Sequence, residues 1–156
     1  MQFKIEQIAI CPKNPAAAIE LLTALGADEW ARDHVVANGF VYGRQRGNEA
    51  DLAFNYTLSG GAKEFEVLNY TEGDNWMAEP SRHNSVSHLG MHCTAEELEE
   101  FRDFFSGRGI KVAQEVFTES HTNPVIAGKR KYNYVIFDTK EILGVDLKFI
   151  VRVDQQ

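Results

Sequence analysis

The sequence predicts an α+β fold built from two copies of a β-α-β-β-β module, on three observations. Residues 86–93 (VSHLGMHC) have the pattern of a short strand and run directly into a capped helix that starts after Thr94. The same order of strand, cap and helix occurs once before, at residues 6–15. The two copies are offset by 81 positions, so that Gln7 stands where His88 stands in the second copy. A repeat of this size indicates two units that bury a shared face.

Composition and charge narrow the class of protein. With 156 residues, 44% of them hydrophobic and 25% charged, the chain suits a globular domain with a substantial core. A net charge of −7 argues against a nucleic-acid partner. No segment approaches the roughly 18–20 apolar residues of a membrane helix, and the first residues lack a signal-peptide pattern. Cys11 and Cys93 have no disulfide or zinc spacing, so we expect a cytoplasmic protein without a membrane partner.

Local signals define the elements of the first module. Asn14 is a typical helix cap, Pro15 suits the first helical position, and Gly26 suits a helix end. Alternation of apolar and polar residues predicts the strands. The expected elements are a strand near 3–11, a helix near 15–25, an extended stretch at 29–42, a polar turn at 43–50, and strands at 51–56 and 64–70.

The second module repeats this order. Thr94 and Glu97 form a capping-box pattern, and Gly107 suits the end of the helix. The long polar segment 118–130 predicts a loop of functional length. The expected elements are a helix at 95–106 and strands near 110–117, 131–138 and 143–151. The resulting division is a first module at 1–70, a linker at 71–84 and a second module at 85–156, together one compact domain.

Four polar side chains are expected on the strand faces that point away from the helices. Period-2 alternation places Gln7 and Glu66 on such faces in the first module, and His88 and Asp146 in the second. Their spacings within the modules are nearly equal (66 − 7 = 59 and 146 − 88 = 58).

Several motifs carry a resemblance to a known family. They are SHLGMH at 87–92, YVIFDT at 134–139, LGVDLKF at 143–149 and FEVLNY at 65–70. With these motifs the chain resembles the vicinal oxygen chelate superfamily, which includes glyoxalases, bleomycin-resistance proteins and extradiol dioxygenases. The resemblance implies modules that curve a mixed sheet into a half-barrel around a divalent metal. It also implies Gln7, Glu66, His88 and Asp146 as the metal ligands.

The resemblance implies a glyoxalase-like lyase or isomerase that acts on a small substrate chelating the metal through vicinal oxygens. The metal would be Zn, Ni, Co, Mn or Fe and would stabilise an enediolate or oxyanion. Asp146 would be the catalytic base, with Glu66 as the second candidate. Cys11 and Tyr70 occupy the positions at which glutathione-dependent glyoxalases bind their peptide, which argues against a glutathione-linked substrate.

Other interpretations stay open. The chain could instead be a metal-free, bleomycin-resistance-type protein that binds an aromatic or cationic drug, or a relative that acts only through its dimer surface. The resemblance implies a homodimer, and modules that pair either within or across chains. The further pocket candidates, each with core packing or a surface loop as its alternative, are His92, His121, Tyr132 and Tyr134.

Overall fold

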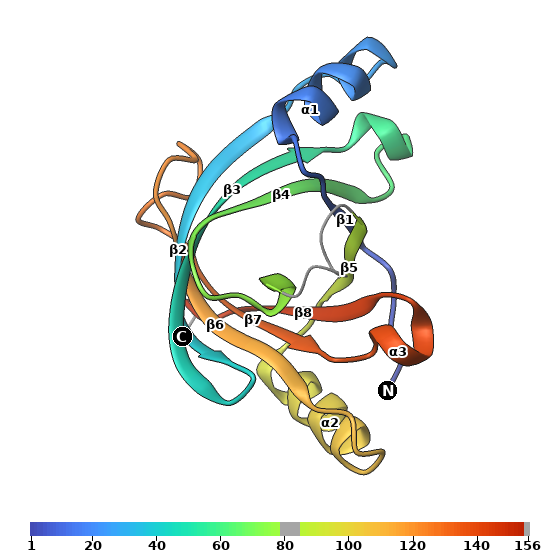
Figure 1. Ribbon diagram of the computed structural model, residues 1–156, viewed down its shortest axis with the longest axis vertical. Helices are drawn as coiled ribbons and strands as arrows, with labels where there is room; N and C mark the ends of the chain where they lie inside the picture. The colour runs from blue at the N-terminus through green and yellow to red at the C-terminus, as the bar shows by residue number, and fades with distance from the viewer. Residues whose placement is uncertain (79–84, 155–156) are drawn as a thin grey trace.

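Eight strands close into one barrel in a computed structural model that describes residues 1–78 and 85–154 (Figure 1). The predicted α+β class with a curved mixed sheet is therefore confirmed. The strands are β1 (Gln7–Cys11), β2 (Ala31–Val41), β3 (Arg44–Asn55), β4 (Glu64–Gly73), β5 (Ser85–His92), β6 (Val112–Ser120), β7 (Lys131–Phe137) and β8 (Asp146–Arg152). The helices are α1 (Pro15–Ala24), α2 (Ala95–Ser106) and the single-turn α3 (Lys140–Leu143), with short 3₁₀ turns at Thr57–Ser59 and Trp76–Ala78.

Each half of the barrel has the same strand order. The first half runs β1-β4-β3-β2 and the second half runs β5-β8-β7-β6, with the first and fourth strands of each half parallel. Antiparallel pairing of β1 with β5 and of β2 with β6 joins the halves at two seams. Both seams lie within one chain, so the two halves of a single chain complete the barrel.

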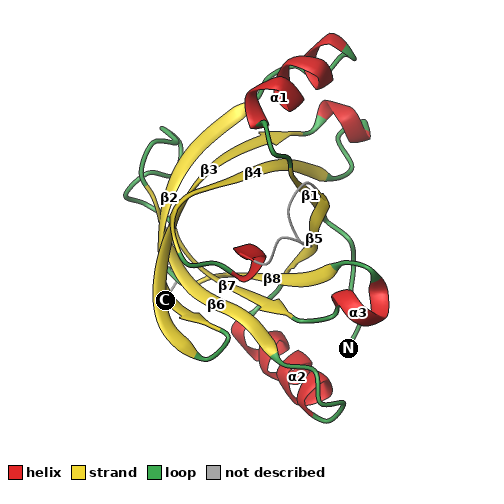
Figure 2. Cartoon of the chain, in the orientation of Figure 1, coloured by secondary structure: helices red, strands yellow, loops and turns green. Residues whose placement is uncertain are grey.

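The two main helices lie outside the barrel, α1 beside one half and α2 beside the other (Figure 2). The predicted caps are present. The Asn14 side chain accepts from the Ala17 amide, and Thr94 forms the capping box with Glu97. The α2 helix buries Leu98, Phe101 and Phe105 against β7 and β8, in a cluster that includes Phe137 and Phe149. No helix in the described ranges is long and apolar enough to span a membrane.

The predicted polar turn at 43–50 is wrong, because most of it belongs to β3. The chain reverses in two residues, Tyr42 and Gly43, which both have positive φ values (46° and 75°), as tight hairpins require. The exposed end of this hairpin carries the polar residues 44–46.

The segment expected to be a linker is partly structured. β4 extends to Gly73, and Trp76 and Met77 are each only 1% exposed in a core cluster with Leu68 and Ile136. Residues 79–84 of that segment lie outside the described residues.

Candidate functional site

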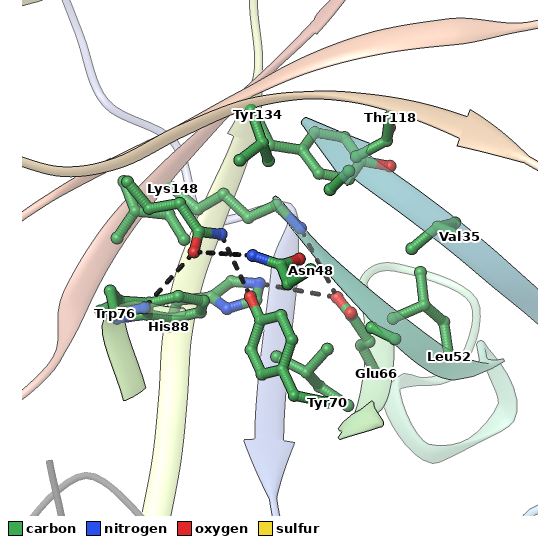
Figure 3. A pocket seen from close by; sticks show the side chains of 16 residues that line it. Val35, Asn48, Leu52, Glu66, Tyr70, Trp76, His88, Thr118, Tyr134 and Lys148 are labelled. Carbon is green, nitrogen blue, oxygen red and sulfur yellow. Dashed lines mark hydrogen bonds and ion pairs between the residues drawn. The ribbon is translucent and has the colours of Figure 1, made fainter. Parts of the chain in front are cut away.

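A cluster of four buried polar side chains lies inside the barrel, one from each strand nearest the first seam. Gln7, Glu66, His88 and Lys148 come from β1, β4, β5 and β8 and are between 1% and 5% exposed. Figure 3 shows Glu66, His88 and Lys148 pointing toward one another. Gly90 leaves room for this arrangement, since a Cβ there would lie only 3.0 Å from Gln7 Oε1.

Opposite charges and hydrogen-bonding groups meet within 4 Å in this cluster. His88 Nε2 lies 2.7 Å from Gln7 Oε1 and 3.5 Å from Glu66 Oε2. Lys148 Nζ lies 3.5 Å from Gln7 Oε1, 3.9 Å from Glu66 Oε2 and 4.1 Å from the centre of the Tyr134 ring. Among the described residues, Glu66 Oε2 receives no hydrogen bond with good geometry. The cluster therefore contains the ion pair Lys148–Glu66, in which Glu66 Oε2 can still accept a hydrogen bond.

A chain of hydrogen bonds defines the tautomer of His88. The Glu64 carboxylate accepts from the Tyr56 hydroxyl and from Gln7 Nε2, the latter at 2.5 Å. Gln7 therefore turns its carbonyl oxygen toward His88, and His88 Nε2 must carry the proton that this oxygen accepts. The other ring nitrogen, Nδ1, is left to accept from the Ser87 hydroxyl at 3.0 Å.

The pKa values of Glu66 and His88 are both lowered, for different physical reasons. Burial opposes the charge on Glu66, but Lys148 and then His88 outweigh it and lower the pKa of the Glu66 carboxyl. Burial, with help from Lys148, lowers the pKa of His88 to about 4 against the opposing influence of Glu66. At neutral pH Glu66 is therefore a carboxylate and His88 a neutral imidazole.

We expect the free energy of unfolding to fall as the pH drops from 6.5 to about 4. His88 in the unfolded chain takes up a proton over this window while folded His88 stays neutral, so acid favours unfolding, by about 3 kcal/mol in total. Urea unfolding across this pH range measures the slope, and His88→Gln should reduce it.

His34→Gln is the matched control for this pH profile. His34 lies on the outside of the barrel, where hydrogen bonds to Asp51 and Glu49 raise its pKa. Its stabilising contribution is complete below its ordinary pKa and is lost as the pH rises through the raised value. His34→Gln should therefore change the slope only on the alkaline side, and an unchanged acid slope in His88→Gln would contradict the assignment to His88.

Two spaces adjoin the cluster. The inner cavity, about 30 Å³, is lined by Glu66 and His88 among others and has room for roughly one water molecule. A second space of about 290 Å³ opens at the mouth of the barrel and is large enough for a small organic molecule. Lys148 and Tyr134 line both spaces, so they separate the mouth pocket from the inner cavity.

The other predicted pocket residues lie around this mouth or outside it. Tyr132 and His92 line the mouth pocket, and the half-exposed His92 ring lies 3.4 Å from the Glu6 carboxylate. His121 is exposed and lines neither space.

The loop after β6 is held against the mouth by a buried carboxylate. Asp33 accepts hydrogen bonds from the Ser120 hydroxyl at 2.5 Å and from the amides of Thr122 and Asn123 at 3.1 and 3.0 Å. This anchor places four residues of the predicted functional loop along the mouth pocket: Asn123, Val125, Ile126 and Arg130.

Asp146 is the predicted site residue that lies apart from the cluster. Its Oδ1 accepts from the amides of Thr139 and Lys140 at 3.1 and 3.0 Å, and its Oδ2 accepts from Trp76 Nε1 at 3.0 Å. These contacts connect β8, the start of α3 and the segment after β4. The position expected for the fourth ligand is instead taken by Lys148, two residues along the same strand face.

The strand ladders, rather than the spacing of the repeat, identify Lys148 as a residue of the cluster. In the ladders, Ala9 pairs with Glu66 and Gly90 pairs with Lys148. Ala9 and Gly90 differ by the same offset of 81 as Gln7 and His88, so Lys148 is the structural counterpart of Glu66.

The residues present do not fit the expected four-ligand metal centre. Gln7, Glu66 and His88 supply three donor types that suit a divalent metal, but an ammonium group completes the set. Lys148 repels a second cation within about 4 Å, and His88 Nε2 carries a proton where a ligand needs a lone pair. Within residues 1–78 and 85–154, no group of three or more His, Cys, Asp and Glu side chains is placed to hold a metal.

No protein-family model and no curated protein matches this chain. Solved structures share its fold. The hypothetical protein BH1468 from Bacillus halodurans C-125 has a TM-score of 0.54 at 12% identity, covering 98% of this chain and 96% of that chain. A methylmalonyl-CoA epimerase variant from Streptomyces coelicolor in complex with 2-nitronate-propionyl-CoA has a TM-score of 0.53 at 16% identity, covering 97% and 98%.

A further methylmalonyl-CoA epimerase structure, in complex with methylmalonyl-CoA and NH4+, has a TM-score of 0.53 at 17% identity and covers 97% of this chain and 95% of that chain. At these identities the likeness shows the fold. The shared fold is the α+β class with a curved mixed sheet that the sequence predicted.

Proposed function

We propose that this chain is a small-molecule-binding barrel protein that works without a bound metal. The observation that carries the proposal is a mouth pocket of about 290 Å³ whose inner end is formed by buried charged and polar groups. Such a combination of an apolar wall and a few convergent polar groups is typical of ligand sites. The bound molecule would place its polar end against Lys148 and Gln7 and its apolar part along Phe54 and Tyr132.

Filling the mouth tests this proposal. Ala31 lines the pocket, whereas Ala62 is exposed and is not among the residues that line it. Ligand-observed NMR with a library of small aromatic and aliphatic fragments should detect binders to the native protein. Ala31→Trp should weaken these binders at least tenfold, while Ala62→Trp should leave them unchanged. Fragments whose affinity is unchanged in Ala31→Trp would contradict the proposal. So would a native protein that binds none of the fragments.

The second candidate function is the metal-dependent lyase or isomerase that the family resemblance implies. One observation favours it. Ser87 Oγ lies 3.2 Å from Met77 Sδ and 3.0 Å from His88 Nδ1, so it can donate to the sulfur and accept from a protonated Nδ1. This tautomer is the alternative to the Nε2-protonated one that Gln7 Oε1 favours. In it His88 Nε2 would have a free lone pair for a metal, once the Gln7 carbonyl oxygen turned from His88 toward the same metal.

Metal content separates the two functions. Mass spectrometry on protein purified without a tag should find well under one divalent metal per chain if the metal-free proposal holds. About one metal per chain in the native protein, lost in His88→Ala, would instead establish the metal-dependent function. Full occupancy in both proteins would place the metal elsewhere and contradict both assignments.

A further inference from the structure

We propose that the Lys148 ammonium is the resident cation of the site, in the place where the family resemblance implies a metal, and that the mouth pocket accepts small organic acids. The proposal rests on the small-molecule function above and names its ligand class. The expected metal ligands were Gln7, Glu66, His88 and Asp146, but Lys148 lies beside the first three in place of Asp146.

Lys148 is placed to meet a ligand, whereas Glu66 lies behind it. Of the two spaces, Lys148 and Gln7 line the mouth pocket, whereas Glu66 and His88 line the inner cavity and not the mouth. A ligand in the mouth therefore meets the positive member of the ion pair first. The carboxylate stabilises the buried ammonium from the opposite side, at 3.9 Å.

The ammonium group also has donors to offer. Of its three N–H groups, only one is used among the described residues, in a long contact of 3.5 Å to Gln7 Oε1. Its remaining neighbours are the Glu66 carboxylate, at ion-pair distance, and the face of the Tyr134 ring. A carboxylate or similar oxyanion is the acceptor that best uses such donors, because charge-assisted hydrogen bonds are stronger than neutral ones.

The other charged groups around the mouth also favour an anionic ligand. Arg130 lines the pocket and makes no ion pair within the described part of the chain. The two carboxylates at the mouth are already hydrogen-bonded: Asp33 to the loop after β6, and Glu64 to Tyr56 and Gln7. The polar groups at the mouth that remain available to a ligand are therefore the cations Lys148 and Arg130, although the whole chain carries a charge of −7.

The apolar wall of the mouth suggests the rest of the ligand. It is formed by side chains from β3, β7 and the anchored loop, namely Phe54, Tyr132, Val125 and Ile126. An aromatic or branched aliphatic body fits such a wall, so the ligand class is a small carboxylic acid with an apolar body.

Three probes with one ring and different charges test the ligand class by titration calorimetry: benzoate, benzamide and benzylamine. Native protein should bind benzoate at least tenfold more tightly than either of the others. The double variant Glu66→Gln/Lys148→Met removes both charges together and leaves no lone buried ion, so it should fold and lose this preference.

The outcomes of this titration separate the two proposals. Benzamide or benzylamine binding as tightly as benzoate would keep the small-molecule function and overturn the acid preference. Preference for benzoate that persists in the double variant would overturn the role of Lys148. Binding of none of the probes or library fragments would overturn the small-molecule function itself, and the metal titration below would still decide the role of Lys148.

A metal titration tests the resident cation directly. Lys148→Glu replaces the ammonium by a carboxylate beside Gln7, Glu66 and His88, and should bind Zn²⁺ at least 100-fold more tightly than native protein. Lys111→Glu makes the same charge change at an exposed position and should bind Zn²⁺ like native protein. Lys148→Gln, which only removes the cation, should gain at least tenfold and serves if Lys148→Glu does not fold. A folded Lys148 variant without any gain would overturn the inference.

Discussion

Replacing Asp146 by alanine is expected to lower the free energy of unfolding by about 3–5 kcal/mol, because three largely buried N–H donors each lose their acceptor. These donors are the amides of Thr139 and Lys140 and the indole of Trp76. Urea unfolding at neutral pH measures the loss. The prediction also separates two roles, since a residue needed only to ligate or transfer protons could be removed with little loss of stability.

Asp146→Asn and Trp76→Phe form the control for this prediction. The amide keeps an oxygen for the Thr139 and Lys140 amides but turns an N–H toward the indole N–H of Trp76. Trp76→Phe removes that second donor, so the double variant should be more stable than the sum of the single losses by about 0.5–3 kcal/mol. A loss below about 0.5 kcal/mol in Asp146→Ala would be typical of a surface position and would contradict the structural role.

Replacing Gly39 by alanine is expected to cost more than about 4 kcal/mol, because the new methyl group has no space at the second seam. A Cβ at Gly39 would lie 2.0 Å from the carbonyl oxygen of Glu115 and 2.8 Å from Cα of Val116. Both are backbone atoms of β6, so relief requires β2 and β6 to separate, which opens the barrel. Loss of cooperative thermal unfolding, followed by circular dichroism, would report this opening.

Gly60→Ala is the comparison that isolates steric contact from backbone strain. Gly60 has a φ of 64°, but among the described residues no neighbouring atom lies within 4 Å of the point that a new methyl group would occupy. The variant therefore carries only the left-handed penalty of about 1–2 kcal/mol. Equal losses in the two variants would show that the seam tolerates the extra methyl group.

Local signals in the sequence predicted the helices well. The Asn14 cap and the Thr94–Glu97 capping box act within a few residues, and both helices begin where these motifs place them. The alternation of side chains also put Gln7, Glu66 and His88 on the barrel interior. The turn at Tyr42–Gly43 was missed because exposed hairpin strands carry the same polar residues as a loop.

Register and closure could not be read from local pattern. Asp146 and Lys148 are two residues apart on β8, so their side chains point to the same face of the strand. Only the pairing of Gly90 with Lys148 decides which of the two lies beside Glu66. That pairing depends on contacts between strands far apart in the sequence. The same holds for the seams, since a module with two free edges can pair either with its own second half or with another chain.

The seams also govern the order in which the protein can assemble. His88 reaches Gln7 across 81 positions and Lys148 reaches it across 141, and folds dominated by such distant contacts form slowly. Of the eight barrel strands β8 is made last, and it brings the only cation of the four-residue cluster. A nascent chain without β8 therefore holds Glu66 uncompensated and leaves β5 and β7 with unpaired edges open to other chains. Pairing of β8 closes the barrel and brings Lys148 beside Glu66 in the same step, so closure of the barrel and formation of the binding site coincide.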